Sequence, residues 1–191
     1  QSVKLPKALK PHDSVQLSFD WHYEISLESG REGMIDSTTY YLAYFYPRVS
    51  VFDDYYGWDR IEFIDMQEFY SDFNDYTLTV NAPKNYIVWA TGDLQNPGEV
   101  LSADAAKKLN SSLTSDEIIH VATKQDIANK TVTAQNAMNA WKWKANNIPD
   151  VTVNVSDHYV WDAGSVMVDD AAQRRASVQA AYNDTAKDFH S

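Results

Sequence analysis

The side chains of this chain that could do acid–base or metal chemistry are its five histidines and its many carboxylates. None of the histidines has a second histidine or a glutamate at ligand spacing on an expected helix. The sequence also lacks H-E-x-x-H, G-x-S-x-G and a glycine-rich phosphate loop. We therefore expect no catalytic centre and no zinc site in this chain, and interpret the histidines as structural; they are His12, His22, His120, His158 and His190.

The carboxylates are concentrated in residues 53–75, where Arg60 is the one basic residue. This run lacks the spacing of a calcium-binding loop and has aromatic residues between its acids, so we interpret it as a solvated surface, with calcium left open. The net charge of −11 disfavours nucleic acid and anionic membranes as partners. The chain has no cysteine, which excludes disulfides, thiol catalysis and Cys-ligated zinc.

The elements that must position these groups are mostly strands. Residues 14–27 alternate apolar and polar side chains without a break, as a strand with one buried face does. Residues 38–46 are apolar or aromatic throughout, which predicts a strand covered on both faces and stopped by Pro47. Further strands are expected at 76–82, 86–91, 117–122, 138–147, 158–168 and 175–182.

One segment has helical rather than strand periodicity. In residues 102–113, Ser102 is a suitable N-cap, and Ala105, Ala106, Leu109 and Leu113 fall on one helical face. The sequence therefore predicts an all-β fold of mostly antiparallel sheets, packed as a saddle or sandwich, with one short helical insertion. No apolar run is long enough to span a membrane.

Trp141 and Trp143 alternate with Lys142 and Lys144 on one expected strand. The two indoles either pack into the core or form an exposed platform for a sugar ring. We favour the core, because this strand has few other apolar residues to bury.

Residues 41–59, which read YLAYFYPRVSVFDDYYGWD, resemble the N-terminal domain of bacterial aminopeptidase-N-like zinc metallopeptidases, the gluzincin aminopeptidases. The order of motifs carries the resemblance from about residue 10 to residue 182, through A-T-G-D-L at 90–94 and an aromatic strand before Asp150. Its later part matches at Trp143, Tyr159, Trp161 and Asp162. The signature residues, which we read as structural, are Pro47, Asp53, Asp54, Gly57, Trp58 and Gly92.

The resemblance implies that residues 1–183 are the N-terminal β domain of a larger peptidase and that 184–191 begin the connection to a catalytic domain. The zinc and its H-E-x-x-H motif would then belong to that C-terminal domain of the same polypeptide, and this chain would be inactive alone. Its partners would be the catalytic domain and, indirectly, a peptide substrate. A periplasmic, cell-surface or secreted location is implied by the family.

The candidates for residues near the peptide cleft are Tyr44, Tyr46 and Arg48, because phenols and a guanidinium can meet peptide carbonyls or a carboxylate. The alternative is that the two tyrosines are core residues and that Arg48 makes a surface ion pair. Tyr44 stands where many relatives have a glutamine near the substrate amine, so that role does not carry over. An interface with the catalytic domain predicts an exposed aromatic patch that includes part of 40–48.

A second hypothesis is a stand-alone, secreted β-sandwich module that binds a partner such as carbohydrate. The all-β pattern, the aromatic residues and the acidic surface motivate it.

Overall fold

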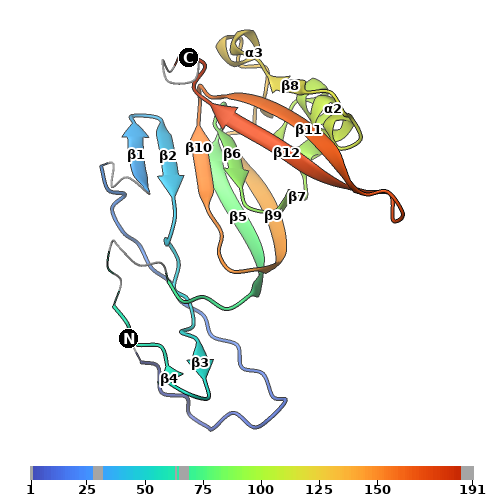
Figure 1. Ribbon diagram of the computed structural model, residues 1–191. Coiled ribbons are helices and arrows are strands. Elements are labelled where there is room, and N and C mark those ends of the chain that lie inside the picture. The colour runs from blue at the N-terminus through green and yellow to red at the C-terminus, as the bar shows by residue number, and fades with distance from the viewer. Residues whose placement is uncertain (1, 28–31, 63, 65–68, 186–191) are drawn as a thin grey trace.

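The computed structural model describes residues 2–27, 32–62, 64 and 69–185 (Figure 1). Strands make up 40% of the described residues and helices 11%, and every paired strand is antiparallel to its neighbour. The predicted mostly-β class with antiparallel sheets and few short helices is therefore confirmed.

The strands are β1 (Gly33–Asp36), β2 (Thr39–Leu42), β3 (Phe52–Asp53), β4 (Gly57–Trp58), β5 (Asn74–Pro83), β6 (Ile87–Ala90), β7 (Asp93–Leu94), β8 (Ile119–Ala122), β9 (Met138–Ile148), β10 (Val153–Ser156), β11 (Val160–Asp169) and β12 (Arg174–Tyr182). The helices are α1 (Pro97–Val100), α2 (Ala103–Ser112) and α3 (Lys124–Ala128).

Four sheets organise these strands. One has the order β1-β2-β10-β6, a second β5-β9-β7 and a third β12-β11-β8, and β3 pairs with β4 alone. In Figure 1 the first three sheets gather in one half of the molecule, while the β3–β4 hairpin lies apart from them. The long β11–β12 hairpin extends past the other strands at its tip.

The core is built on β9, whose alternation directs Trp141 and Trp143 inward and Lys142 and Lys144 to solvent. Trp141 is fully buried and Trp143 is 3% exposed, so the sugar platform is ruled out for these two residues and their assignment to the core is correct. The second sheet places Leu78 opposite Trp143 across β5 and β9. The core continues into the other two large sheets through Ile87, Val88, Trp89, Val153 and Trp161.

Helix α2 forms where the periodicity of 102–113 predicts it. Ser102 is the N-cap, and its hydroxyl accepts a hydrogen bond from the Ala105 amide at 3.2 Å. Ala105, Ala106 and Leu109 are buried on the face that meets the core, whereas Leu113, also expected on that face, is the C-cap and is 45% exposed. Helices α1 and α3 were not predicted, although Thr123 and Asp126 at the start of α3 form a capping box.

The predicted strand at 14–27 is wrong. The segment has no strand pairing up to Ser26, and Leu27 makes an isolated bridge to Met34. Its apolar side chains are exposed, so the alternation does not here mark a buried face. A strand needs hydrogen-bonded neighbours, and no described strand runs beside this segment.

The strand expected at 38–46 is shorter than predicted. It ends at Leu42, well before Pro47, because Tyr44 has a left-handed backbone conformation with φ of 57°. The strands expected at 76–82, 86–91, 117–122, 138–147, 158–168 and 175–182 are present as β5, β6, β8, β9, β11 and β12. The expectation for residues 184–191 lies largely outside the described residues, which end at 185.

Gly92 lies between β6 and β7, where the chain approaches β9 closely before β7 pairs with it. Its φ is +101°, and a Cβ atom added there would lie 2.3 Å from the Lys144 carbonyl oxygen. We predict that Gly92→Ala lowers the free energy of unfolding by about 3 kcal/mol, through backbone strain and this collision. Gly98→Ala is the matched control, because nothing lies within 4 Å of its added Cβ. Equal urea-unfolding midpoints for the two variants would contradict the prediction.

Candidate functional site

The best-defined polar cluster brings two of the three cleft candidates onto one carboxylate. The Tyr46 hydroxyl donates to Asp150 Oδ1 at 2.7 Å, and Arg48 Nη1 donates to Asp150 Oδ2 at 2.9 Å. Asp150 Oδ1 also accepts from the Val151 amide at 2.8 Å. Asp150 lies between β9 and β10, so one loop acts as the anchor for the segment that follows β2.

Tyr44 and Arg48 come together around the aromatic ring of Phe69. The Arg48 guanidinium carbon lies 4.4 Å from the centre of the Phe69 ring and 6.0 Å from that of Tyr44. The Tyr44 and Phe69 rings are 5.0 Å apart. Arg48 Nη1 also donates to Ser71 Oγ at 2.8 Å. The three cleft candidates therefore form one cluster with Phe69, Ser71 and Asp150.

The cluster favours a neutral Tyr46. Partial burial, the hydrogen-bonding contacts with Tyr76 and Asp150, and the negative charge of Asp150 all raise the pKa of Tyr46 far above its ordinary value. The Tyr76 hydroxyl lies 3.0 Å from that of Tyr46. A phenol held neutral in this way is a hydrogen-bond donor and does not act as a base.

The two side chains nearest Asp150 are already engaged. The Arg48–Asp150 ion pair matches the surface-pair alternative for Arg48, and Tyr46 is half-buried. Tyr46 and Arg48 each donate a hydrogen bond to Asp150, so this geometry supports a role in positioning the segment that carries them.

The signature hairpin, residues 52–58, carries the aromatic-Asp-Asp and Gly-Trp motifs on β3 and β4. Asp53 Oδ1 accepts from the Tyr55 amide at 2.9 Å and also from the Tyr56 amide, which closes the turn. Gly57 has a φ of +74°, a conformation that this residue adopts without a steric penalty. The Phe52 and Trp58 rings pair across the hairpin at 5.1 Å.

The aromatic side chains of this hairpin face solvent. Tyr55 is 82% exposed and Tyr56 83%, and Phe52 and Trp58 are each more than half exposed. An exposed aromatic patch was predicted to include part of 40–48, but those residues are buried or half-buried apart from Pro47. Exposed aromatic rings instead lie on the hairpin that follows, and further exposed apolar residues occur after it at Ile61, Ile64, Tyr70 and Phe73.

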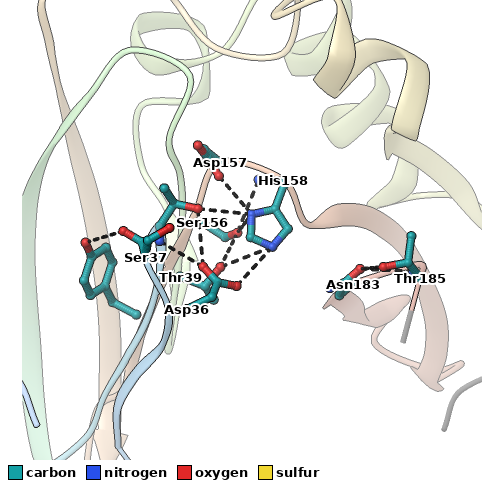
Figure 2. Close-up of polar contacts among 10 residues, drawn as sticks. Asp36, Ser37, Thr39, Ser156, Asp157, His158, Asn183 and Thr185 are labelled. Carbon is teal, nitrogen blue, oxygen red and sulfur yellow. Dashed lines mark hydrogen bonds and ion pairs between the residues drawn. The ribbon is translucent and has the colours of Figure 1, made fainter. Parts of the chain in front are cut away.

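A second polar cluster surrounds His158. Asp157 Oδ1 lies 2.9 Å from His158 Nδ1, and Asp36 Oδ2 lies 3.3 Å from Nε2. Figure 2 shows the ring between these two carboxylates, with Ser156 and Thr39 beside it. Ser156 Oγ is 3.4 Å from His158 Nδ1 and 2.9 Å from Thr39 Oγ1.

Serine, histidine and aspartate also form nucleophilic triads, but this arrangement does not support one. Ser156 is 1% exposed, so a substrate carbonyl cannot approach its hydroxyl. Both ring nitrogens of His158 already face carboxylates. The cluster ties the β1–β2 hairpin to the turn between β10 and β11, and the structural interpretation of His158 agrees with this geometry.

In this cluster the surroundings of Asp36 change the pKa of its carboxyl group. Partial burial acts to raise its pKa, but the hydrogen bonds from Thr38 and Thr39 and the nearby His158 outweigh burial. The net effect holds the pKa of Asp36 below its ordinary value.

His120 lies in a third, smaller cluster on the β8-β11-β12 sheet. Its Nδ1 is 2.6 Å from Asp162 Oδ1, and the Tyr182 hydroxyl donates to Asp162 Oδ2 at 2.8 Å. Within residues 2–27, 32–62, 64 and 69–185, no three His, Asp or Glu side chains are grouped as metal ligands. In the same ranges no helix has the length and apolar character needed to cross a membrane.

Comparison of the chain with protein-family profiles, with curated proteins and with solved structures found no match.

Sequence reasoning named Tyr44, Tyr46 and Arg48 but did not connect them with Asp150 or Phe69. It missed the His158 cluster, because Asp36 and Thr39 are far from Ser156 in sequence. The available signal was the Ser156-Asp157-His158 run, which places three polar groups next to one another.

We predict that Tyr46→Phe lowers the free energy of unfolding at neutral pH by about 1 to 2 kcal/mol, since Asp150 loses a donor. Because folding raises the pKa of Tyr46, its contribution is present below the unfolded value of about 10 and is lost as the pH rises further. The wild-type chain should therefore lose more stability between pH 9 and 11 than Tyr46→Phe does. Tyr55→Phe, at an exposed site, is the control. Parallel pH profiles for wild type and Tyr46→Phe in urea unfolding would contradict this.

We predict that Asp36→Asn reduces the acid sensitivity of the fold. Because the folded pKa of Asp36 is lowered, its contribution is present above the unfolded value of about 4 and is lost as the pH falls through the lower folded value. At pH 7 Asp36→Asn should lower the free energy of unfolding by about 0.5 to 1 kcal/mol, because solvent weakens a partly exposed ion pair. Thermal unfolding at pH 7 and pH 3 measures the change in stability between the two pH values, and Asp170→Asn, at an exposed position, is the control. An identical pH 7 to pH 3 difference in Asp36→Asn and wild type would show that Asp36 is not the group responsible.

Proposed function

We propose that this chain is the non-catalytic N-terminal domain of a zinc-dependent aminopeptidase, and that it packs on the catalytic domain and walls one side of the peptide cleft. The proposal starts from the order of motifs between residues 41 and 94. The observation that supports the proposal most is a contrast within residues 41–59. Tyr46 and Arg48 are fixed to the body through Asp150, whereas the aromatic rings of the signature hairpin are exposed.

An exposed cluster of large aromatic residues is unusual for a surface that meets only water. The hairpin holds its shape without such a cover, through the Asp53 turn and Gly57, so its rings are presented in a defined arrangement. A rigid aromatic patch of this kind is suited to packing against another folded surface. In the proposed enzyme that surface belongs to the catalytic domain, which also supplies the zinc and the general base.

The cleft candidates lie directly before this patch in sequence. Phe69 and Ser71, which Tyr44 and Arg48 contact, lie within the acidic run of residues 53–75. We assign Asp150 the role of holding Tyr46 and Arg48 in place beside the cleft. Tyr44 is the member that we propose to lie nearest the peptide.

A stand-alone carbohydrate-binding module is the second candidate function. The exposure of Tyr55, Tyr56 and Trp58 favours it, because aromatic rings can stack on sugar faces. The two functions differ in what must accompany this chain, since the binding module needs no catalytic domain.

The test is the reading frame that contains this chain, followed by an assay of its product. We predict an H-E-x-x-H motif downstream, zinc-dependent release of the N-terminal residue from aminoacyl anilides by the full-length protein, and no activity from the present chain alone. In the full-length enzyme, Tyr44→Phe should change kcat/KM without changing the melting temperature. Tyr182→Phe, at a half-buried position on β12 outside the cleft cluster, should change neither the kcat/KM nor the peptide preference. A frame without the motif, or activity in the isolated chain, would refute the proposal.

A further inference from the structure

Residues 14–27, named here the alternating segment, are apolar on every second residue and lack a strand partner in the described structure up to Ser26. The apolar side chains are between 37% and 76% exposed; they are Val15, Leu17, Phe19, Trp21, Tyr23, Ile25 and Leu27. In Figure 1 the segment passes around the β3–β4 hairpin as a long excursion from the sheets. A run of this length with one apolar face is suited to pairing with another strand.

The alternating segment is attached to the body at two points. The Trp21 indole N–H donates to the Phe45 carbonyl at 2.8 Å, and the Met34 amide donates to the Ser26 carbonyl at 2.8 Å. These bonds fix the middle and the end of the segment, so it is presented in a defined position.

The sequence of the segment is complementary to itself in one antiparallel register. With Trp21 opposite Trp21 of a second copy, Phe19 faces Tyr23, Leu17 faces Ile25 and Val15 faces Leu27. Aromatic residues then meet aromatic ones and aliphatic residues meet aliphatic ones, which are the favourable cross-strand pairs.

The polar face supports the same register. Asp20 lies opposite His22 of the second copy, and Glu24 lies opposite Ser18. No two carboxylates face each other, which matters for a chain with a net charge of −11. A two-fold axis at Trp21 forms each of these pairs twice, as an isologous interface requires.

We propose that the alternating segment pairs with the same segment of a second copy of this chain, as an antiparallel two-stranded ribbon centred on Trp21, and so forms a homodimer. This inference is independent of the proposed function, because it uses residues outside the signature hairpin and the cleft candidates.

The first test is the mass of the full chain by sedimentation equilibrium over a concentration series. We expect wild type to reach twice the chain mass and Phe19→Lys to remain at the mass of a single chain. Val178→Lys, which places the same charge on an exposed apolar residue of β12, should keep the wild-type mass. Circular dichroism of each variant checks that the fold is retained. A wild-type chain that stays monomeric at its highest soluble concentration overturns the proposal, whether or not another protein binds the segment.

The second test reads the register. The chain has no native cysteine, so any disulfide that forms must join introduced cysteines. The double variant Asp20→Cys/His22→Cys places its thiols opposite each other across the two-fold axis, and mild oxidation should give a covalent dimer. In Ser14→Cys/Glu24→Cys the two positions are out of register, and cross-linking should be several-fold weaker. Equal cross-linking in the two variants would contradict the proposed register.

Discussion

The burial of tryptophan on β9 is the constraint on which the rest of the structure depends. Trp141 and Trp143 lie inside, with Trp89 from the first sheet and Trp161 from the third packed in the same core. The indole nitrogens of Trp89, Trp141 and Trp143 are buried and have no hydrogen-bond acceptor among the described residues, which costs about 1 to 3 kcal/mol each. Burying an indole contributes about 5 kcal/mol, so the core is favourable despite this loss. The close approach at Gly92 lies beside this strand, because Gly92 directly precedes β7, which pairs with β9 at Lys144 and Trp143.

The core also determines where the candidate site lies. Asp150 follows β9 directly, so the strand that carries the buried tryptophans delivers the carboxylate that holds Tyr46 and Arg48. Beyond Arg48 the chain leaves the packed half of the molecule and forms the signature hairpin, whose turn is closed by its own Asp53. The same stretch of sequence thus has one end fixed by long-range contacts and one end stabilised locally and open to solvent. This division supports an interface at the hairpin, with the Asp150 cluster as its attachment to the core.

Elements whose signals are local were predictable from the sequence. The alternation around Trp141 gave β9, and Ser102 with its apolar helical face gave α2 within one residue at each end. The alternating segment shows the limit of this reasoning, because its period of two is the same whether or not a neighbouring strand exists. The strand predicted at 38–46 ends early because Tyr44 has a left-handed backbone conformation, which its aromatic side chain does not predict. The contacts of Tyr46 with Asp150, and of His158 with Asp36, join residues more than a hundred positions apart and depend on the sheet order, which no local pattern contains.

Whether the signature hairpin is an interface is tested most directly by amide hydrogen exchange of residues 52–58, measured in this chain alone and in the longer polypeptide that we propose it belongs to. If the exposed rings pack on a catalytic domain, these amides should exchange at least tenfold more slowly in the full-length protein. The amides of β9, which are already within a sheet and next to the core, should be little changed and serve as the internal reference. Equal exchange of residues 52–58 in the two forms would show that the hairpin stays exposed and would contradict the interface.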